Sequence, residues 1–243
     1  MNLEGRVALV TGAARRVGRA IALRLAGAGC RVAAHYHDSE SDAGRLVEEI
    51  QRAGGDAGAF QADLAQADAP ARLVEETLRR FGRLDILVNN AAVFEKMRLD
   101  QFELEAWDRT LRVNLTAPMA LAFAARAALR ASRGRILNLC DVATRRPWPD
   151  HLAYIVSKAG LETLTAALAR AFAPDVNVVG IAPGVALWPE SYDHPTRERL
   201  LARVPLARAG TPADIAAAAH FLLAEADYVT GVVLPVDGGR SVV

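Results

Sequence analysis

Residues 6–18 read RVALVTGAARRVG, and this stretch decides the fold. Its first part, Arg6–Val10, is rich in aliphatic and β-branched side chains, which predicts a short buried strand. Two glycines lie in the turn that follows, and Arg19–Gly27 has the spacing of a helix. Such a turn lets the backbone approach a phosphate group and points helix N–H groups at it. Because Arg16 occupies the place of the usual middle glycine, an ordinary tight strand-to-helix turn stays open as an alternative.

The same alternation of strand and helix continues to the end of the chain. Six further aliphatic runs are separated by alanine-rich stretches of helical period, namely Arg31–His35, Ala57–Gln61, Leu84–Val88, Arg135–Leu139, Val176–Ile181 and Val232–Val236. Strands that are apolar on both sides and separated by amphipathic helices imply a parallel sheet covered on both faces. The expected fold class is α/β, a doubly wound Rossmann-type parallel sheet of about seven strands with helices on both faces.

Length and composition agree with one globular domain. The chain has 243 residues, and no linker or internal repeat divides it, so 1–243 is expected to be a single domain. Hydrophobic residues make up 52% and charged residues 23%, which excludes a disordered chain. The 29 Lys and Arg residues balance 28 Asp and Glu residues without a dense basic tract, so no nucleic-acid partner is expected.

The cysteines and the apolar segments bear on the compartment. Cys30 and Cys140 stand singly in apolar runs, without the spacing of a metal or redox motif, so we expect buried thiols in a reducing cytosol and no metal. No window reaches the roughly 18 uninterrupted apolar residues of a membrane span, and Met1–Val10 is too short for a signal peptide. A cytoplasmic protein without a membrane partner is the expectation.

Two segments interrupt the regular pattern. Pro118 is expected to bend a long helix that starts near Trp107. The stretch from Gly184 to Pro195 lacks a clear period, and we expect a mobile substrate loop over about 184–205. In this fold ligands bind at the carboxyl ends of the strands, which is where this loop would lie.

Tyr154 and Lys158 are a candidate catalytic pair. Four residues apart on a helix, they share one face. A cation near a phenol stabilises the phenolate, which would make a group with an ordinary pKa of about 10 usable near neutral pH. Tyr154 would then donate a proton. For the pair alone, a surface tyrosine and lysine one turn apart is the plainer alternative.

Further polar residues fall where a nucleotide lying across the strand ends would meet them. They are Asp63 after the third run, Asn89-Asn90-Ala91 after the fourth, Asn114 in the long helix and Pro183-Gly184 after the sixth. With these motifs, and with Tyr228-Val229-Thr230-Gly231 and Val236-Asp237-Gly238-Gly239 near its end, the chain resembles the short-chain dehydrogenase/reductase family over essentially its whole length. That family has a Rossmann fold and uses NAD(P).

The resemblance implies roles for individual residues. Catalysis would rest on Tyr154, Lys158, Asn114, which in the family anchors a proton-relay water, and Asp141, thirteen residues before Tyr154 at the family's serine-to-tyrosine spacing. NADPH or NADP would be held by Gly12, Arg15, Arg16, Val17, Gly18, Tyr36, His37, Ser39, Asp63, Leu64, Asn90, Ala91, Ala92, Tyr154, Lys158, Pro183 and Gly184. Lys158 would hold the ribose hydroxyls of the nicotinamide.

The end of the second strand predicts which cofactor is preferred. NAD-specific members place a carboxylate there to hold the ribose hydroxyls, whereas this chain has Tyr36. Arg15 and Arg16 in the facing turn offer positive charge to a 2′-phosphate, while Asp38 would repel it. NADPH is the expected cofactor.

Four departures from the common family pattern resemble pteridine reductases and the related dihydromonapterin reductases. They are Arg16 in the turn, His35-Tyr36-His37 at the end of the second strand, Phe94 after the Asn-Asn-Ala motif, and Asp141 where most members carry serine. The resemblance implies a pterin substrate bound by Arg16, Phe94, Asp141, Tyr154 and Trp188.

Several of these residues also have plainer interpretations. Asp141 could cap a turn; alternatively its carboxylate could accept from pterin N–H groups or, when protonated, supply Tyr154 with a proton. Phe94 could be a core residue instead of a stacking platform. His35 and His37 alternate on their strand, which predicts one core and one solvent-facing histidine.

The leading interpretation is an NADPH-dependent pterin reductase that delivers hydride to the carbon of a C=N bond. Tyr154 and Asp141 would supply the proton to nitrogen. A carbonyl reductase, such as a 3-oxoacyl thioester reductase, is the alternative enzyme. A protein that binds NADP(H) without turnover is the alternative outside the enzymes, and the complete set of Tyr154, Lys158 and Asn114 argues against it. The family resemblance suggests a homotetramer.

Overall fold

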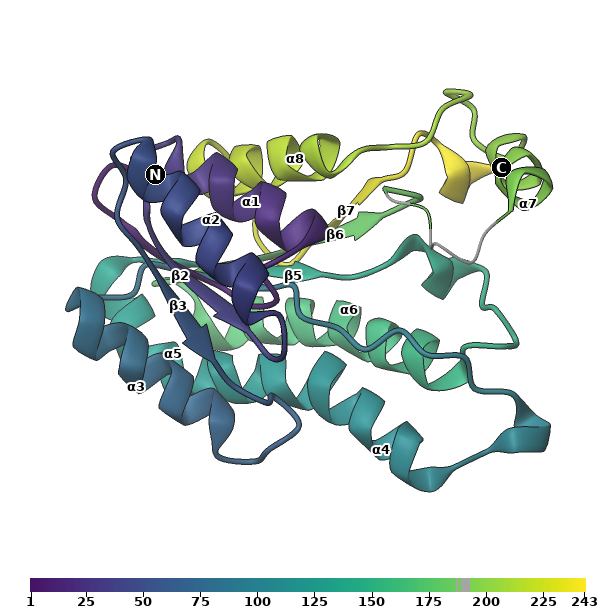
Figure 1. The fold of residues 1–243 in the computed structure, drawn as a ribbon, viewed down its shortest axis with the longest axis horizontal. Helices are drawn as coiled ribbons and strands as arrows, with labels where there is room; N and C mark the ends of the chain where they lie inside the picture. Colours follow the sequence, from purple (N-terminus) through teal and green to yellow (C-terminus); the bar gives the residue numbers. More distant parts are fainter. Residues whose placement is uncertain (187, 189–192) are drawn as a thin grey trace.

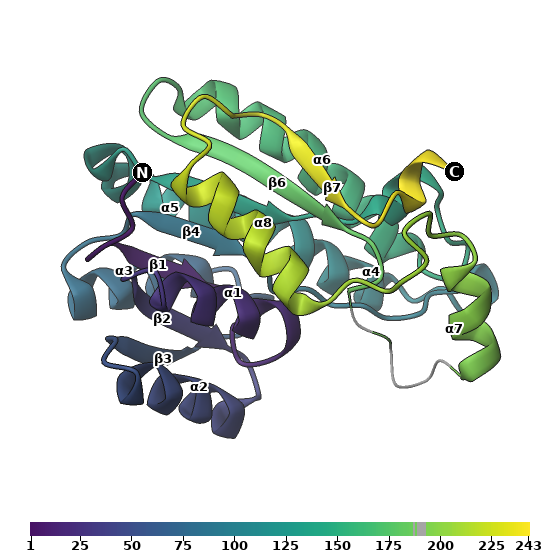
Figure 2. The same cartoon turned by 90° about the horizontal axis from the view of Figure 1, so that it is seen from above.

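The computed structural model describes residues 1–186, 188 and 193–243, and one parallel sheet runs through them. Its order is β3-β2-β1-β4-β5-β6-β7 (Figures 1 and 2). The strands are β1 Val7–Val10, β2 Arg31–Tyr36, β3 Ala57–Gln61, β4 Ile86–Asn89, β5 Arg135–Leu139, β6 Asn177–Pro183 and β7 Val233–Val236. Each predicted strand is confirmed to within two residues at its ends.

Helices cover both faces of the sheet, as Figure 1 shows. One face carries α1 (Arg16–Ala26), α2 (Glu40–Arg52) and α8 (Pro212–Ala224). The other carries α3 (Ala69–Phe81), α5 (Ala117–Ser132) and α6 (Leu152–Phe172), with α4 (Leu104–Leu111) beside α6. The short α7 (His194–Leu201) lies beyond the carboxyl ends of β6 and β7. The expected doubly wound fold is confirmed.

Strand β1 shows why the strand runs are apolar on both sides. Val7 and Leu9 belong to the core on the side of α5, whereas Ala8 and Val10 belong to the core on the side of α1. All four side chains are fully buried. Successive side chains of a strand point to opposite faces, so a central strand between two helix layers needs apolar residues at every position.

Three boundaries differ from the sequence prediction. Helix α1 begins at Arg16 rather than Arg19, because the chain enters the helix directly from the turn. The long helix begins at Leu104 rather than near Trp107 and contains a π-helical segment before α5. Pro118 lies in the first turn of α5, where it has no N–H to donate to the carbonyl four residues earlier. That carbonyl belongs to Asn114.

The expected loop over 184–205 is wrong in its second half, where α7 forms. The Asp193 carboxylate accepts from the N–H of Thr196 at 3.0 Å, and Pro195 lies in the first turn, so the helix has both a cap and a preset backbone. Residues 187 and 189–192 of the predicted loop lie outside the described residues.

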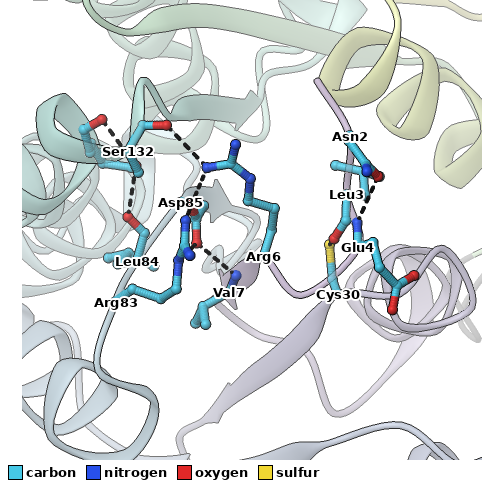
Figure 3. Close-up of polar contacts among 11 residues, drawn as sticks. Asn2, Leu3, Glu4, Arg6, Val7, Cys30, Arg83, Leu84, Asp85 and Ser132 are labelled. Atoms are coloured by element: carbon cyan, nitrogen blue, oxygen red, sulfur yellow. Dashed lines mark hydrogen bonds and ion pairs between the residues drawn. The ribbon is translucent and has the colours of Figure 1, made fainter.

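A buried ion cluster joins the amino ends of β1 and β4, at the edge of the sheet away from the predicted site (Figure 3). The Asp85 carboxylate is fully buried and accepts from Arg6 (2.6 Å), from both Arg83 nitrogens (2.8 and 2.6 Å) and from the Val7 N–H (2.9 Å). Burial alone would raise the Asp85 pKa, but these hydrogen bonds lower it. Because every oxygen is satisfied, the carboxylate stays charged and holds the two strands in register.

Two further predictions concern the core. Cys30 and Cys140 are buried free thiols, as expected, and burial raises the pKa of each to about 12.

Helix α6 is long and apolar enough to span a membrane by length and composition, with a mean hydropathy of 1.2 over its best window, but half of that stretch is buried inside the fold. The buried core helix of a soluble protein has the same length and composition, so these two properties alone do not make α6 a membrane span.

Candidate active site

Thr11 and Asn90 tie the turn after β1 to the loop after β4. The Thr11 hydroxyl accepts from the N–H groups of Asn90 (2.9 Å) and Ala91 (3.0 Å). The Asn90 amide donates to the carbonyl oxygens of Thr11 (2.8 Å) and Gly12 (3.0 Å). The strand order reverses between β1 and β4, and in open α/β sheets ligands bind at such a point.

Position 18 requires glycine because neighbouring atoms lie too close to leave room for a side chain. A Cβ there would lie 2.2 Å from the Gly12 oxygen and 2.4 Å from the Asn90 amide nitrogen. Arg16, in the place of the family's middle glycine, adopts a positive φ of 53°, so it takes the conformation that glycine would supply. The turn therefore keeps the glycine-type backbone path while adding a cation.

A cleft of about 390 Å³ lies along the carboxyl ends of β1 to β4. Of the residues predicted to hold the cofactor, those in its lining are Gly12, Arg15, Tyr36, His37, Ser39, Asp63, Leu64, Ala91 and Ala92, together with Phe94 from the predicted substrate site. Arg16, Val17, Gly18, Asn90, Tyr154, Lys158, Pro183 and Gly184 lie outside that lining. The cleft therefore gathers the residues predicted for the 2′-phosphate end of the cofactor except Arg16.

The charges at this end of the cleft partly neutralise one another. Tyr36 is buried, so the position of the NAD-specific carboxylate carries no charge. Arg15 forms an ion pair with Asp42, which Arg45 also contacts. The Asp38 carboxylate accepts from its neighbour Ser39 at 3.2 Å.

The candidate catalytic centre is built around the Tyr154 hydroxyl, which donates to Oδ2 of Asp141 at 2.7 Å. The other Asp141 oxygen accepts from the N–H of Ala143 at 2.8 Å. Asp141 therefore caps the turn, as one interpretation expected, and also accepts from the tyrosine, while its role toward a pterin stays a prediction. Burial raises the pKa of the Asp141 carboxyl despite these hydrogen bonds, which favours its protonated form.

The Tyr154 pKa is raised in this arrangement, so the expected net lowering of it by Lys158 is wrong. The Lys158 ammonium donates to the Leu139 carbonyl at 2.6 Å and lies 5.8 Å from the centre of the Tyr154 ring. Burial first, and the negative charge of Asp141 second, raise the Tyr154 pKa well above its ordinary value, while Arg16 acts weakly in the opposite direction. The phenol is therefore held in its protonated form.

Asn114 joins three segments of the site. Its side-chain oxygen accepts from the Val93 N–H at 2.7 Å, and its amide donates to the Val93 carbonyl (2.9 Å) and to the Ser157 hydroxyl (3.0 Å). The loop after β4 is thereby fixed to α6 next to the catalytic tyrosine. The predicted role in anchoring a water stays a prediction.

An aromatic wall borders the tyrosine, and the sequence indicated only part of it. Phe94 is 43% exposed, so it is no core residue, and its ring centre lies 4.7 Å from that of Tyr154 in an edge-to-face arrangement. His151 stacks on Phe94 with ring centres 4.6 Å apart, and Trp148 packs edge-on against both. The signal that could have located His151 is its place one helical turn before Tyr154.

The remaining predicted residues lie at the ends of β6 and beyond. Pro183 ends β6, and the Gly184 N–H donates to the Val236 carbonyl at 3.0 Å. A Cβ on Gly184 would lie 2.8 Å from Asp237. Trp188 packs under the guanidinium of Arg197, which is 5.9 Å from its ring centre, and its contact with substrate stays a prediction.

Known proteins share the fold and much of the sequence. A family model described as enoyl-(acyl carrier protein) reductase matches residues 12–241. The 3-oxoacyl-[acyl-carrier-protein] reductase of Synechocystis sp. is 37% identical over 241 residues, which are 98% of this chain and 97% of that protein. The chain belongs to the short-chain dehydrogenase/reductase family.

Two solved structures of this family place similar chains beside nicotinamide nucleotides. The blue fluorescent protein from a metagenomic library, in complex with NADPH, has a TM-score of 0.92 and 34% identity over 99% of each chain. FolM alternative dihydrofolate reductase 1 from Brucella canis, complexed with NADP, has a TM-score of 0.93 and 33% identity, covering 100% of this chain and 96% of that chain. The crowded glycines of the β1–α1 turn and the uncharged end of β2 in this short-chain dehydrogenase/reductase fit such a nucleotide.

Proposed function

We propose that this chain is an NADPH-dependent reductase of pterins, converting a dihydropteridine to a tetrahydropteridine. The observation that carries the proposal is the 2.7 Å hydrogen bond from Tyr154 to Asp141 beside the exposed ring of Phe94. A serine at position 141 would donate a hydrogen bond to a ketone oxygen, whereas a carboxyl group can accept from the N–H groups of a pterin. A flat heterocycle also gains from an aromatic platform.

The proton chemistry follows from two groups that share one hydrogen bond. NADPH supplies the hydride that adds to the carbon of the C=N bond, and a proton must reach the nitrogen. The Tyr154 phenol, kept protonated by burial and by Asp141, donates that proton. Asp141 in its protonated form, which burial favours, then returns a proton to the tyrosine oxygen across the same hydrogen bond, and the Asp141 carboxylate left behind takes up a proton from solvent. Lys158 is buried beside this pair and donates to the Leu139 carbonyl at 2.6 Å.

NADPH is the proposed cofactor in preference to NADH, with Arg15, His37 and Ser39 at its 2′-phosphate. The buried, uncharged Tyr36 at the end of β2 supports this choice, while Asp38 opposes it. One charge-assisted contact of about 1.5–3 kcal/mol corresponds to roughly tenfold to a hundredfold in affinity. We expect kcat/KM for NADPH to exceed that for NADH by at least about tenfold; an equal or higher value with NADH contradicts the assignment.

A 3-oxoacyl thioester reductase is the second candidate, and the 37% identity to the Synechocystis sp. enzyme favours it. The tyrosine, lysine and asparagine are common to both reactions. The Asp141 carboxyl distinguishes them, since the ketone reaction needs a donor at that position. The intact catalytic set argues against a third possibility, a protein that binds NADP(H) without turnover.

The deciding experiment measures NADPH consumption with dihydrobiopterin, dihydromonapterin, dihydrofolate and an acetoacetyl thioester side by side. Turnover of one or both dihydropterins with little turnover of the thioester supports the proposal. Turnover of the thioester alone supports the second candidate. NADPH binding without oxidation on the whole panel supports the non-catalytic alternative.

We further propose a cytoplasmic homotetramer. Exposed apolar side chains on α5 and α8 support assembly, notably Phe123 (69% exposed), Met119 (43%) and Phe221 (46%). Such side chains are typical of surfaces that pack against another subunit. Light scattering after size-exclusion chromatography should give four times the 26.0 kDa chain mass, and a monomer or dimer mass contradicts the tetramer.

A further inference from the structure

His35 connects three strand ends through its imidazole ring. It is the second-last residue of β2 and is 2% exposed. Its Nδ1 accepts the backbone N–H of Gly12 at 3.1 Å, and its Nε2 lies 3.1 Å from the carbonyl oxygen of Ala62. Gly12 belongs to the turn after β1, and Ala62 directly follows β3. One side chain therefore holds together the turns that flank the cleft.

Only one form of the imidazole satisfies both contacts. The Gly12 N–H is a donor, so Nδ1 must be without a proton, and the Ala62 carbonyl is an acceptor, so Nε2 must carry one. An imidazolium would place an N–H against the N–H of Gly12. Burial, opposed in part by the bond to Ala62, lowers the His35 pKa to about 4, and the nearby charge of His37 acts in the same direction.

Both ends of this bridge belong to the lining of the cleft. Gly12, His35 and Ala62 all line it. Gly12 has a φ of +61°, and a Cβ on it would lie 3.0 Å from the Cα of Ala91, so the turn is a constrained piece of backbone. The Asn90 amide holds the Gly12 carbonyl, and the bond to His35 fixes the direction of the Gly12 N–H. A turn already held in its binding shape loses less conformational freedom when a ligand binds.

We infer that His35 is a positioning residue for the nicotinamide nucleotide, acting as a neutral bridge that holds the Gly12 turn in its binding shape. The bond to Gly12 is the one that matters for binding, since Gly12 belongs to the phosphate-facing turn. The bond to Ala62 fixes the tautomer and the ring orientation. The inference does not depend on which substrate is reduced.

Two substitutions separate the two bonds. In His35→Asn the side-chain oxygen takes nearly the place of Nδ1 and can still accept from Gly12, but the bond to Ala62 is lost. In His35→Leu both bonds are lost, while the apolar leucine side chain has a volume similar to that of histidine. His220→Leu on α8 is the matched control, because it is the same change on a helix outside the cleft lining.

The first measurement is the Kd for NADPH and for NADP by titration calorimetry without substrate. We expect His35→Leu to weaken binding by about tenfold, His35→Asn by less than about threefold, and His220→Leu not at all. Binding by His35→Leu within twofold of wild type, or an equal loss in both His35 variants, overturns the inference.

The second measurement is hydrogen exchange of the ligand-free protein, followed by mass spectrometry of a peptide that contains Gly12. His35→Leu should raise exchange of that peptide by about tenfold and leave the peptides of β5 and β6 as in wild type. General destabilisation would raise exchange throughout the sheet and would contradict a positioning role. If His35→Leu does not fold, His35→Asn decides: normal NADPH binding and normal exchange at Gly12 uphold the bridge, and loss of both overturns it.

Discussion

At the scale of single residues, Tyr154 is the group whose loss is most informative. Its hydroxyl bonds to Asp141 and its raised pKa keeps it protonated, so it carries a proton that could be donated whichever substrate is reduced. Tyr154→Phe keeps the ring but removes this proton. We expect kcat to fall by about 10²–10⁴ while the Kd for NADPH stays within a few-fold. Activity within a few-fold of wild type would show that another group protonates the substrate.

Asp141 separates the two proposed substrate classes. Asp141→Ser creates the arrangement that donates to a ketone, so we expect pterin turnover to fall by roughly tenfold to a thousandfold and thioester turnover to stay equal or rise. Asp141→Asn is the control, because it keeps the shape and the bond to Ala143 but cannot carry the proton. Undiminished pterin activity in Asp141→Ser would refute the pterin assignment. A parallel loss of both activities would indicate a structural role for the cap at Ala143 alone.

Phe94 tests the same distinction through packing. Its exposed ring faces Tyr154 on one side of the site and is backed by His151. Phe94→Ala should raise KM for a pterin by about twofold to tenfold, equivalent to stacking worth about 0.5–1.5 kcal/mol, and change KM for an acyl thioester much less. Steady-state kinetics with both substrates measure the difference. Equal changes in the two KM values would place Phe94 outside the substrate contact.

At the scale of elements, the β1–α1 turn depends on a glycine that the close approach of the turn's own backbone requires. A Cβ at Gly18 would overlap the Gly12 oxygen at 2.2 Å, and this atom belongs to backbone that cannot move aside cheaply. Gly18→Ala should therefore weaken NADPH binding by tenfold or more and lower Tm. Gly44→Ala in α2 is the matched control, since nothing lies within 4 Å of the place that its Cβ would take. That control should be stabilising by up to about 1 kcal/mol, because alanine favours a helix interior; equal effects of the two changes would contradict the steric explanation.

The long helix shows how an element positions chemistry by being irregular. The π-helical segment places Asn114 against Val93 and Ser157, where it connects α6 to the loop after β4. Pro118, in the first turn of α5, has no N–H to donate to the Asn114 carbonyl four residues earlier.

At the scale of the whole molecule, the buried histidine makes stability depend on pH. The His35 pKa is about 4 in the folded protein and about 6.5 when unfolded, so between these values the unfolded chain binds more protons. The free energy of unfolding should therefore fall as the pH falls from about 6.5 to 4, by on the order of 3 kcal/mol from this residue. Burial also lowers the His151 pKa, which adds to the same trend, whereas the raised pKa of Asp141 opposes it.

Urea unfolding at fixed protein concentration between pH 4.5 and 7.5 measures this slope. His35→Asn should flatten it, since asparagine has no proton to bind in this range. An unchanged slope in His35→Asn would show that the loss of stability in acid comes from other groups.

The sequence by itself determined the features that depend on local spacing. The strand runs, the glycine turn and the shared face of Tyr154 and Lys158 repeat with the periods of strands and helices, so they can be read from neighbouring residues. The doubly wound sheet and the position of the site at the strand ends follow from the order of those elements. The sequence did not predict helix α7, because its cap is a single side-chain hydrogen bond at Asp193 and the stretch shows no periodic spacing of apolar residues.

Only the tertiary structure decided how distant segments meet. The stacking of His151 on Phe94 and the bridge from His35 to Gly12 and Ala62 join residues more than twenty positions apart, so no local pattern encodes them. The direction of the Tyr154 pKa shift was decided in the same way. Sequence spacing placed a lysine on the same face of the helix, but burial and the bond to Asp141 outweigh that charge, because desolvation depends on what the whole fold packs around the hydroxyl.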